Sequence, residues 1–158
     1  GKKEDDVNVK HLTISQSKGY GVFGYVYGSE GMSFHLFHVH IEKSEGSGVY
    51  VFKTKRNTMS NCQVSHSKRS GAEVKGGLIT MKGSGTSIHN NVTGGRSDLY
   101  GLRTYSSSSS IHLVSPLTKE SVSINNGGGG NYGGNGLIAI VDNEGTIVTT
   151  IQEASDDY

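Results

Sequence analysis

Short alternations of apolar and polar residues recur along the chain, and a polar corner follows each of them. In HVHIEKSEGSGVYVF, residues 38–52, Val39 and Ile41 alternate with polar residues. Charged residues, serines and glycines come next, and Val49 and Val51 then begin a second alternation. Such alternation is typical of half-buried strands, and polar clusters with glycine are typical of turns. The stretch therefore predicts a strand, a corner and a second strand, and no apolar run of helical period accompanies it.

The strand–corner–strand unit returns in a constant frame. Four segments align without gaps: LTISQSKGYGVFGY from residue 12, VHIEKSEGSGVYVF from 39, VSHSKRSGAEVKGG from 64 and VTGGRSDLYGLRTY from 92. Two apolar columns result, namely Leu12, Val39, Val64 and Val92, and then Val22, Val49, Val74 and Leu102. Both columns advance by 27, 25 and 28 residues, and a poorer fifth copy occupies residues 111–125.

A repeat of this length with two or three short strands predicts one coil of a parallel β-solenoid. A single coil cannot bury its apolar face, so stacked coils must supply the core. Leucine-rich repeats have a similar length, but their leucine and asparagine spacing is missing from this sequence, as are the helices of ankyrin and tetratricopeptide units. We expect an all-β fold, a parallel β-helix of about five coils of 25–28 residues.

Stacking places equivalent residues above one another at the strand spacing of about 4.8 Å. The residues expected to point inward are Leu12, Ile14, Val39, Ile41, Val64 and Val92 of the first strand, and Val22, Val49, Val51, Val74 and Leu102 of the second. Gly19, Gly46 and Gly71 recur in the corners, where we expect a positive φ angle that glycine adopts at little cost.

The pattern changes near residue 126. NNGGGGNYGG predicts a flexible or tightly turning linker, and GLIAIV, DNEG and TIVTTI predict a β-hairpin followed by an acidic tail. We therefore divide the chain into coils over residues 1–125 and an extension over 126–158. Both hairpin strands are apolar on two faces, so the hairpin should pack on another subunit or close the solenoid.

Composition narrows the classes of partner. The formal net charge is +1, which gives no bias toward nucleic acid, and the longest apolar run is too short to span a membrane. Cys62 is the one cysteine, which excludes an intramolecular disulfide and predicts a buried thiol. The glycine-rich stretch lacks the lysine and the following helix of a phosphate-binding loop, so we expect no nucleotide cofactor.

The outward positions of the second strand hold the candidate binding chemistry. In the same frame one outward column is Phe23, Tyr50, Lys75 and Arg103, and the next is Tyr25, Phe52, Gly77 and Tyr105. Aromatic rings on a rigid sheet can stack on the apolar faces of sugars, and neighbouring polar groups can bind the hydroxyls. The predicted substrate-binding residues are Phe23, Tyr25, Tyr50, Phe52, Lys75, Arg96, Arg103 and Tyr105. The alternative is that this face is a contact between subunits.

Carboxylates and bases at the corners are candidates for catalysis. Gln16, Lys43, Lys68 and Arg96 should form one column, and the candidate catalytic residues are Glu42, Glu45, Glu73 and Asp98. Glycosidases need two carboxylates roughly 5–10 Å apart, and the stacking of coils could bring Glu45 beside Glu42, or Glu73 beside Asp98. A lyase would instead need a base and a group that neutralises a uronate. A solvated, self-compensating set of charges is the competing interpretation.

Histidines cluster in FHLFHVH, residues 34–40, and suggest a metal site at first sight. On a strand, His38 and His40 share one face, but no third ligand follows at the usual spacing. We therefore expect no metal and interpret these histidines as surface or subunit-contact residues.

Coils such as LTISQSKGYGVFGY and CQVSHSKRSGAEVKGGLIT, followed by a glycine-rich exit and a hairpin, resemble the pectate-lyase-like right-handed β-helix over residues 7–125. They are most similar to the tailspike and pre-neck appendage proteins of bacteriophages. The resemblance implies a right-handed helix that continues a longer β-helix, a homotrimer, and a virion (tail) or extracellular setting. It also implies binding or depolymerisation of a bacterial surface polysaccharide. A trimeric stalk without ligand and a secreted polysaccharide lyase or epimerase are the alternatives.

Overall fold

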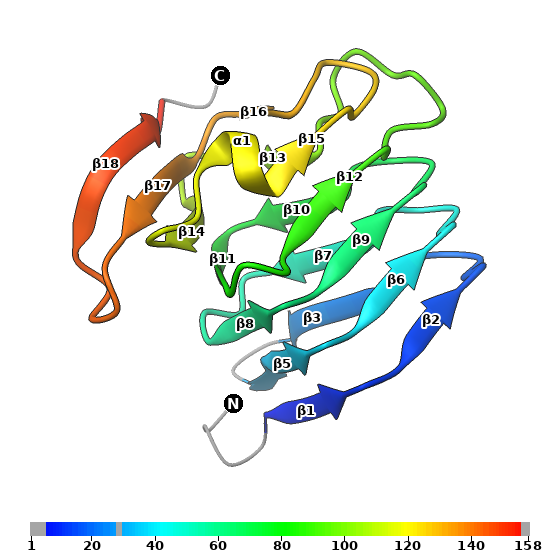
Figure 1. Cartoon of the computed structure of the whole chain (residues 1–158), viewed down its shortest axis with the longest axis horizontal. Helices are drawn as coiled ribbons and strands as arrows, with labels where there is room; N and C mark the ends of the chain where they lie inside the picture. The colour runs from blue at the N-terminus through cyan, green and yellow to red at the C-terminus, as the bar shows by residue number, and fades with distance from the viewer. Residues whose placement is uncertain (1–5, 28–29, 156–158) are drawn as a thin grey trace.

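The computed structural model describes residues 6–27 and 30–155, which wind into stacked coils with three sheets (Figure 1). The seven-stranded sheet contains β1 (Val7–Lys10), β5 (Phe34–Phe37), β8 (Asn57–Ser60), β11 (Gly77–Lys82), β14 (Ser109–Val114), β17 (Leu137–Val141) and β18 (Ile147–Gln152). The six-stranded sheet contains β4 (Glu30–Met32), β3 (Val22–Tyr27), β7 (Val49–Phe52), β10 (Ala72–Lys75), β13 (Leu102–Thr104) and β16 (Tyr132–Gly134). The five-stranded sheet contains β2 (Thr13–Ser15), β6 (His40–Glu42), β9 (Gln63–Ser65), β12 (Ser87–His89) and β15 (Ser123–Ile124).

Strands of successive coils pair in parallel in all three sheets, as β2, β6 and β9 do in the five-stranded sheet. The expected right-handed parallel β-helix of about five coils is confirmed. Two pairs are antiparallel, β3 with β4 and β17 with β18, and each lies at the end of its sheet. The one helix of the described residues is the short α1 (Lys119–Val122). Thr118 caps it, because its hydroxyl accepts from the Ser121 amide.

The register differs from the gap-free alignment in the third coil. Val64 pairs with Ile41, and not with Val39, while Ala72, and not Val74, pairs with Val49. The third coil is shorter than the alignment assumed, since only 23 residues separate Ile41 from Val64. A strand alternates with period two, so this slip of two residues leaves the inward side chains facing inward.

Val92 also departs from the expected column. Ile88 of β12 occupies the level above Val64, whereas Val92 lies beyond the strand with a φ angle of 58°. Val92 is still buried, at 2% exposure, because Gly127 and Gly128 of the following coil pack against it. The expected stacking of Val39, Val64 and Val92 is therefore wrong, although all three contribute to the interior.

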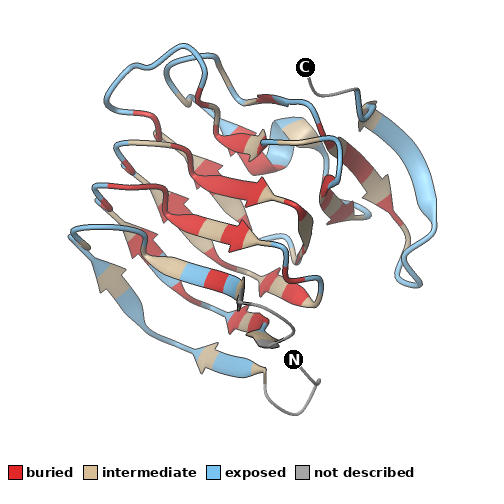
Figure 2. Cartoon of the chain, turned by 180° about the vertical axis from the view of Figure 1, so that it is seen from behind, coloured by how far each residue is buried: buried red, intermediate tan, exposed pale blue. Residues whose placement is uncertain are grey.

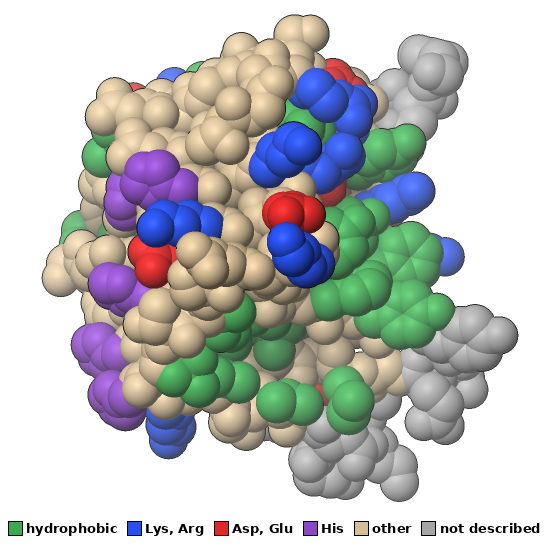
Figure 3. Space-filling view, turned by 90° about the vertical axis from the view of Figure 1, so that its right-hand side faces the viewer, with side chains coloured by type: hydrophobic (Ala, Val, Ile, Leu, Met, Phe, Trp, Pro, Cys, Tyr) green, Lys and Arg blue, Asp and Glu red, His purple; other side chains and the backbone are tan. Residues whose placement is uncertain are grey.

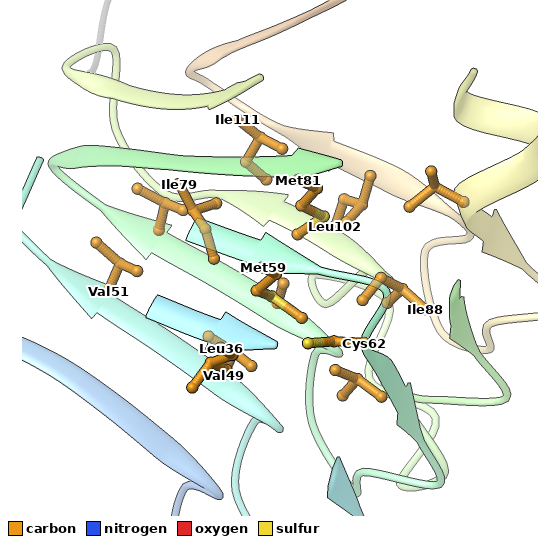
Figure 4. Close-up of a cluster of buried hydrophobic side chains, with 14 of the residues drawn as sticks. Leu36, Val49, Val51, Met59, Cys62, Ile79, Met81, Ile88, Leu102 and Ile111 are labelled. Atoms are coloured by element: carbon orange, nitrogen blue, oxygen red, sulfur yellow. The ribbon is translucent and has the colours of Figure 1, made fainter. Parts of the chain in front are cut away.

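Apolar side chains fill the space between the three sheets, as the buried strands in Figure 2 and the close-up in Figure 4 show. Met59, Ile79 and Ile111 come from neighbouring strands of the seven-stranded sheet and are fully buried. Among the predicted core residues, Leu12 is exposed, at 43%, because it precedes β2 at the edge of its sheet, and Ile14 and Val22 are only partly buried. Cys62 is buried as predicted, and burial raises the pKa of its thiol.

The corners use polar residues, and not the predicted glycine column, for left-handed backbone. Most non-glycine residues with a positive φ angle fall in two series, His11, His38 and Asn61, and then Gln16, Lys43, His66, Asn90 and Asn125. Gly46 and Gly71 have no positive φ, so that expectation was wrong. Close packing explains Gly71 instead, because a Cβ there would lie 2.3 Å from a methyl carbon of Ile88.

At one corner, buried side-chain amides form hydrogen bonds with backbone N–H and carbonyl groups. Asn91 is 1% exposed, its Oδ1 accepts from the Ser67 amide, and its Nδ2 donates to the Val64 carbonyl at 3.0 Å. One coil further, Asn126 donates in the same way to the Ile88 carbonyl. These amides bond the backbone of successive coils, which a buried corner requires.

The coils continue into the glycine-rich stretch. β16 pairs in parallel with β13, and β17 pairs in parallel with β14, so the stacking extends to Val141. The predicted hairpin is confirmed, since β18 folds back antiparallel on β17 through a turn in which the Gly145 amide donates to the Asp142 carbonyl. Ile147 and Val148 remain exposed on β18.

Candidate functional site

The outer face of the six-stranded sheet gathers most of the predicted binding residues. Phe23 pairs with Tyr50, Tyr50 with Glu73 and Glu73 with Arg103, which gives one outward column across β3, β7, β10 and β13. The next outward column runs from Tyr25 to Phe52 and Lys75. The expected column is thus corrected at one level, because Glu73 and not Lys75 lies beside Tyr50. Lys75 stays on the same face, two residues along the strand.

Exposed rings form a continuous cluster on this face. We call it the aromatic strip, and it comprises Tyr20, Phe23, Tyr25, Tyr50 and Phe52. The rings of Tyr20 and Tyr50 stack at 4.6 Å between centroids, and those of Phe23 and Tyr50 meet edge to face at 5.2 Å. Tyr25 stacks on Phe52 at 5.8 Å. Phe23 is 49% exposed and Tyr25 41%, which is unusual for rings of this size. In Figure 3, hydrophobic side chains gather along one side of the view with Lys and Arg above them.

Three cations lie against Phe52, which belongs to the strip, and against the neighbouring Tyr105. Lys75 Nζ lies 4.5 Å from the centre of the Tyr105 ring and the Arg103 guanidinium lies 4.7 Å from it. Lys53 Nζ lies 5.1 Å from the Phe52 ring. Cations at these distances are attracted to the faces of aromatic rings, so they hold the rings in place.

Glu73 and Arg103 form an ion pair within the face. The Glu73 side chain is 3% exposed and the Arg103 side chain 14%. The Ser47 hydroxyl donates to the other Glu73 oxygen at 3.3 Å. Burial, together with the Glu73 charge, raises the pKa of Tyr50 to about 12. Like an ordinary tyrosine, Tyr50 is neutral at physiological pH and has a hydroxyl that can donate a hydrogen bond.

The other acidic candidates lie outside the strands of this face. Asp98 is in the loop before β13, and the Arg96 guanidinium that donates to it holds the pKa of that carboxyl below its ordinary value. The Arg103 charge acts on Asp98 in the same direction, so Glu73 and Asp98 both lie within the field of Arg103. The structure thus brings Arg96, Asp98 and Arg103 to one end of the face.

Glu42 and Glu45 belong to another part of the molecule. Glu42 is in β6 of the five-stranded sheet, and Ser15 donates to it at 3.3 Å. Glu45 pairs with Lys18 at 3.2 Å in the corner that follows. The basic column expected at this corner does not form, because His66, and not Lys68, occupies the level of Lys43.

A groove next to the aromatic strip was missed by sequence reasoning. This lysine groove has a volume of about 400 Å³ and is lined by Phe52, Lys53, Lys55, Lys75, Gly76, Gly77, Ser106 and Ser108. The run KTKR at residues 53–56 was the available signal. The repeat alignment did not include this run, because it lies in the corner between the six-stranded and seven-stranded sheets, beyond the aligned segments.

The histidines lie mainly on a different side of the coil. The rings of His11 and His38 stack at 5.2 Å, and a row of histidines occupies the side of Figure 3 opposite the hydrophobic cluster. His35 instead donates from Nε2 to the buried Asp6 carboxylate at 3.0 Å, and its Nδ1 bonds the Thr58 hydroxyl at 2.8 Å. Within residues 6–27 and 30–155, no group of three metal-ligating side chains converges.

Comparison with known proteins bears on the fold. Over the described residues, no helix has the length and apolarity to cross a membrane. No curated protein and no solved structure gives a match to the chain. Residues 2–151 match the model of a protein family described as the right-handed β-helix region. The match spans nearly the whole chain, and we conclude that the chain belongs to this right-handed β-helix family.

Proposed function

We propose that the chain is a polysaccharide-binding module in which a linear glycan lies along the outer face of the six-stranded sheet. The observation that carries the proposal is the aromatic strip beside Arg103 and Tyr105, in which the exposed rings of Tyr20, Phe23 and Tyr25 pack on the half-buried rings of Tyr50 and Phe52. β-Helix folds are common in proteins that bind or degrade polysaccharides, which agrees with this reading of the face.

The chemistry of the strip suits sugars. The axial C–H groups of a pyranose make apolar patches that stack on aromatic faces, while its hydroxyls need hydrogen-bonding partners. Tyr50 offers both a ring and a neutral hydroxyl, and Arg103 adds donors. Phe23 and Tyr50 occupy equivalent positions in two neighbouring coils, and so do Tyr25 and Phe52, so the face can contact more than one sugar of a polymer.

Binding is better supported than cleavage. A general acid or base must come within hydrogen-bond distance of the glycosidic oxygen. The Glu73 carboxylate is almost fully covered and is already bonded to Arg103 and Ser47. We therefore assign Glu73 to holding Arg103, and we leave cleavage to a direct assay for new reducing ends or unsaturated uronate.

The biological setting that we propose is a bacteriophage tailspike or appendage protein, with a bacterial surface polysaccharide as the ligand and a homotrimer as the assembly. The resemblance in the coil sequences and in the hairpin exit supports this setting. A trimeric stalk uses the same fold without a ligand, and in that case the aromatic strip would be the seam between subunits.

A glycan panel tests the proposal. The wild type, the Phe23→Ala/Tyr50→Ala variant and a Phe37→Ala control are compared on bacterial capsular and wall polysaccharides, with circular dichroism as the check on folding. Phe37 is matched because it is 39% exposed but belongs to the seven-stranded sheet. We expect the double variant alone to lose binding. Equal binding by all three proteins contradicts the proposed face.

Analytical ultracentrifugation of the same variants distinguishes the glycan-binding module from the trimeric stalk. If the strip were a subunit seam, Phe23→Ala/Tyr50→Ala would dissociate the assembly and no glycan would bind the wild type. If it is a glycan surface, the sedimentation of the double variant should equal that of the wild type.

A further inference from the structure

The lysine groove concentrates positive charge at the end of the aromatic strip. Lys53, Lys55 and Lys75 line it together with Phe52, which is also a member of the strip. The whole chain has a formal net charge of only +1, so the charge of the groove is a local feature. Three like charges around one hollow repel one another, which costs free energy unless an anion sits between them.

The three lysines lack a carboxylate partner among the described residues. The ion pairs among the described residues involve other cations, such as Lys18 with Glu45 and Arg96 with Asp98. Lys53 and Lys75 instead lie over the Phe52 and Tyr105 rings, which hold the two ammonium groups beside the groove without neutralising them.

Bare backbone and hydroxyls complete the groove. Gly76 and Gly77 have φ angles of 69° and 90°, and a Cβ on Gly77 would lie 2.2 Å from the Thr54 carbonyl oxygen. Gly77 therefore packs directly against the Thr54 backbone. A Cβ on Gly76 would instead lie 3.3 Å from Lys53 Cγ and 3.6 Å from Ser108 Oγ, between two lining residues, so the missing side chain at Gly76 keeps the groove open. On the other side, the Ser106 and Ser108 hydroxyls are hydrogen-bonded to each other at 3.0 Å, which leaves one of their two protons to donate to an oxygen ligand.

We infer that the lysine groove binds an oxyanion substituent of the glycan, a carboxylate, sulfate or phosphate, and that the ligand of this chain is an acidic polysaccharide. The inference rests on the proposed function, because a polymer that lies on the aromatic strip would place a charged substituent beside Lys75. Lysine ammonium groups act as mobile point charges and not as a planar fork, which suits any of the three oxyanions.

The experiment uses polymers that differ only in charge. Binding of dextran, carboxymethyl-dextran and dextran sulfate is measured by calorimetry at low and moderate salt. The test variant is Lys53→Gln/Lys55→Gln/Lys75→Gln. The control is Lys10→Gln/Lys43→Gln/Lys82→Gln, which removes the same charge from exposed lysines outside the six-stranded sheet.

We expect the wild type and the control to bind at least one charged dextran about tenfold or more tightly than dextran, and we expect the test variant to lose that preference. Salt should weaken the preference. Equal loss in both triple variants, or no preference in the wild type, overturns the inference.

Two further measurements distinguish a failure of the proposed function from a failure of this inference. The Phe23→Ala/Tyr50→Ala variant tests the aromatic strip on uncharged glycan. Binding on the strip can therefore fail while the charge preference of the groove persists, and the charge preference can fail while binding on the strip persists. An oligothymidylate is the third probe, because single-stranded nucleic acid also combines phosphates with rings that stack. Tighter binding of oligothymidylate than of either charged dextran overturns the assignment to an acidic polysaccharide.

Discussion

Tyr50 occupies the centre of the exposed rings, and its surroundings determine what it can do. It contacts Tyr20 and Phe23, and it pairs across the strands with Glu73. Its hydroxyl is protonated at physiological pH, and burial with the Glu73 charge raises its pKa further, to about 12, so ring stacking and hydrogen-bond donation are both available to a ligand. Sequence periodicity identified Tyr50 as outward, but it could not identify Glu73 as its neighbour, since that depends on the length of one corner.

Two substitutions of Tyr50 should distinguish the contribution of its ring to glycan binding from that of its hydroxyl. We expect Tyr50→Ala to weaken glycan binding about tenfold, because the central stacking surface is removed, whereas Tyr50→Phe should weaken it by about threefold or less. Calorimetry with the best ligand of the glycan panel checks both values. Equal loss in the two variants would show that the hydroxyl, and not the ring, carries the interaction.

Asp6 makes a second prediction at the residue scale. Its side chain is 2% exposed, and the Arg56 guanidinium and His35 lower the pKa of Asp6 to about 2. A carboxyl with a lowered folded pKa stabilises the protein above its ordinary value near 3.8, and that stabilisation disappears as the pH falls toward 2. We expect Asp6→Asn to reduce the free energy of unfolding at pH 7 by about 2 kcal/mol.

Urea unfolding as a function of pH tests this expectation. The difference between the wild type and Asp6→Asn should shrink as the pH is lowered from 5 to about 2. The exposed Glu144, replaced by Gln, is the matched control and should change the stability little at any pH. A difference for Asp6→Asn that stays constant with pH would contradict the ion pair as its origin.

The corners determine how far the fold could be predicted from sequence. Period-two alternation located most strands and their inward residues, and the slip of two residues in the third coil did not reverse any face. The coil lengths were not predictable, because a corner of any length can join two correctly alternating strands. Left-handed backbone was assigned to glycines, whereas His38 and Lys43 adopt it, since the tight packing of the coils leaves the glycines another role.

The buried amides make a prediction at the element scale. Asn91 bonds the Ser67 amide and the Val64 carbonyl, and both groups are away from water. We expect Asn91→Ala to reduce the free energy of unfolding by about 2–4 kcal/mol, because it leaves several buried polar groups unpaired. Urea unfolding measures the change, and the exposed Asn143→Ala is the control. A change in Asn91→Ala no larger than in the control would exclude this role.

At the scale of the whole molecule, stacking turns separate residues into one surface. Phe23, Tyr50 and Arg103 are far apart in the sequence, and the parallel register alone aligns them. Four of the five rings of the strip were predictable, because Phe23 and Tyr50, and likewise Tyr25 and Phe52, hold equal places in two neighbouring coils, whereas Tyr20 was not predicted. The lysine groove was not predictable, since Lys53 and Lys55 lie in a corner, and Ser106, which also lines the groove, belongs to a corner two coils later.

Chemical-shift mapping is the most direct test of the central claim, that a glycan lies along the outer face of the six-stranded sheet. Isotopically labelled protein is titrated with the best ligand of the glycan panel, and backbone amide shifts are followed residue by residue. We predict that the changes concentrate in β3, β7, β10 and β13, centred on Tyr50 and Arg103. Changes confined to the five-stranded or seven-stranded sheet would contradict the account.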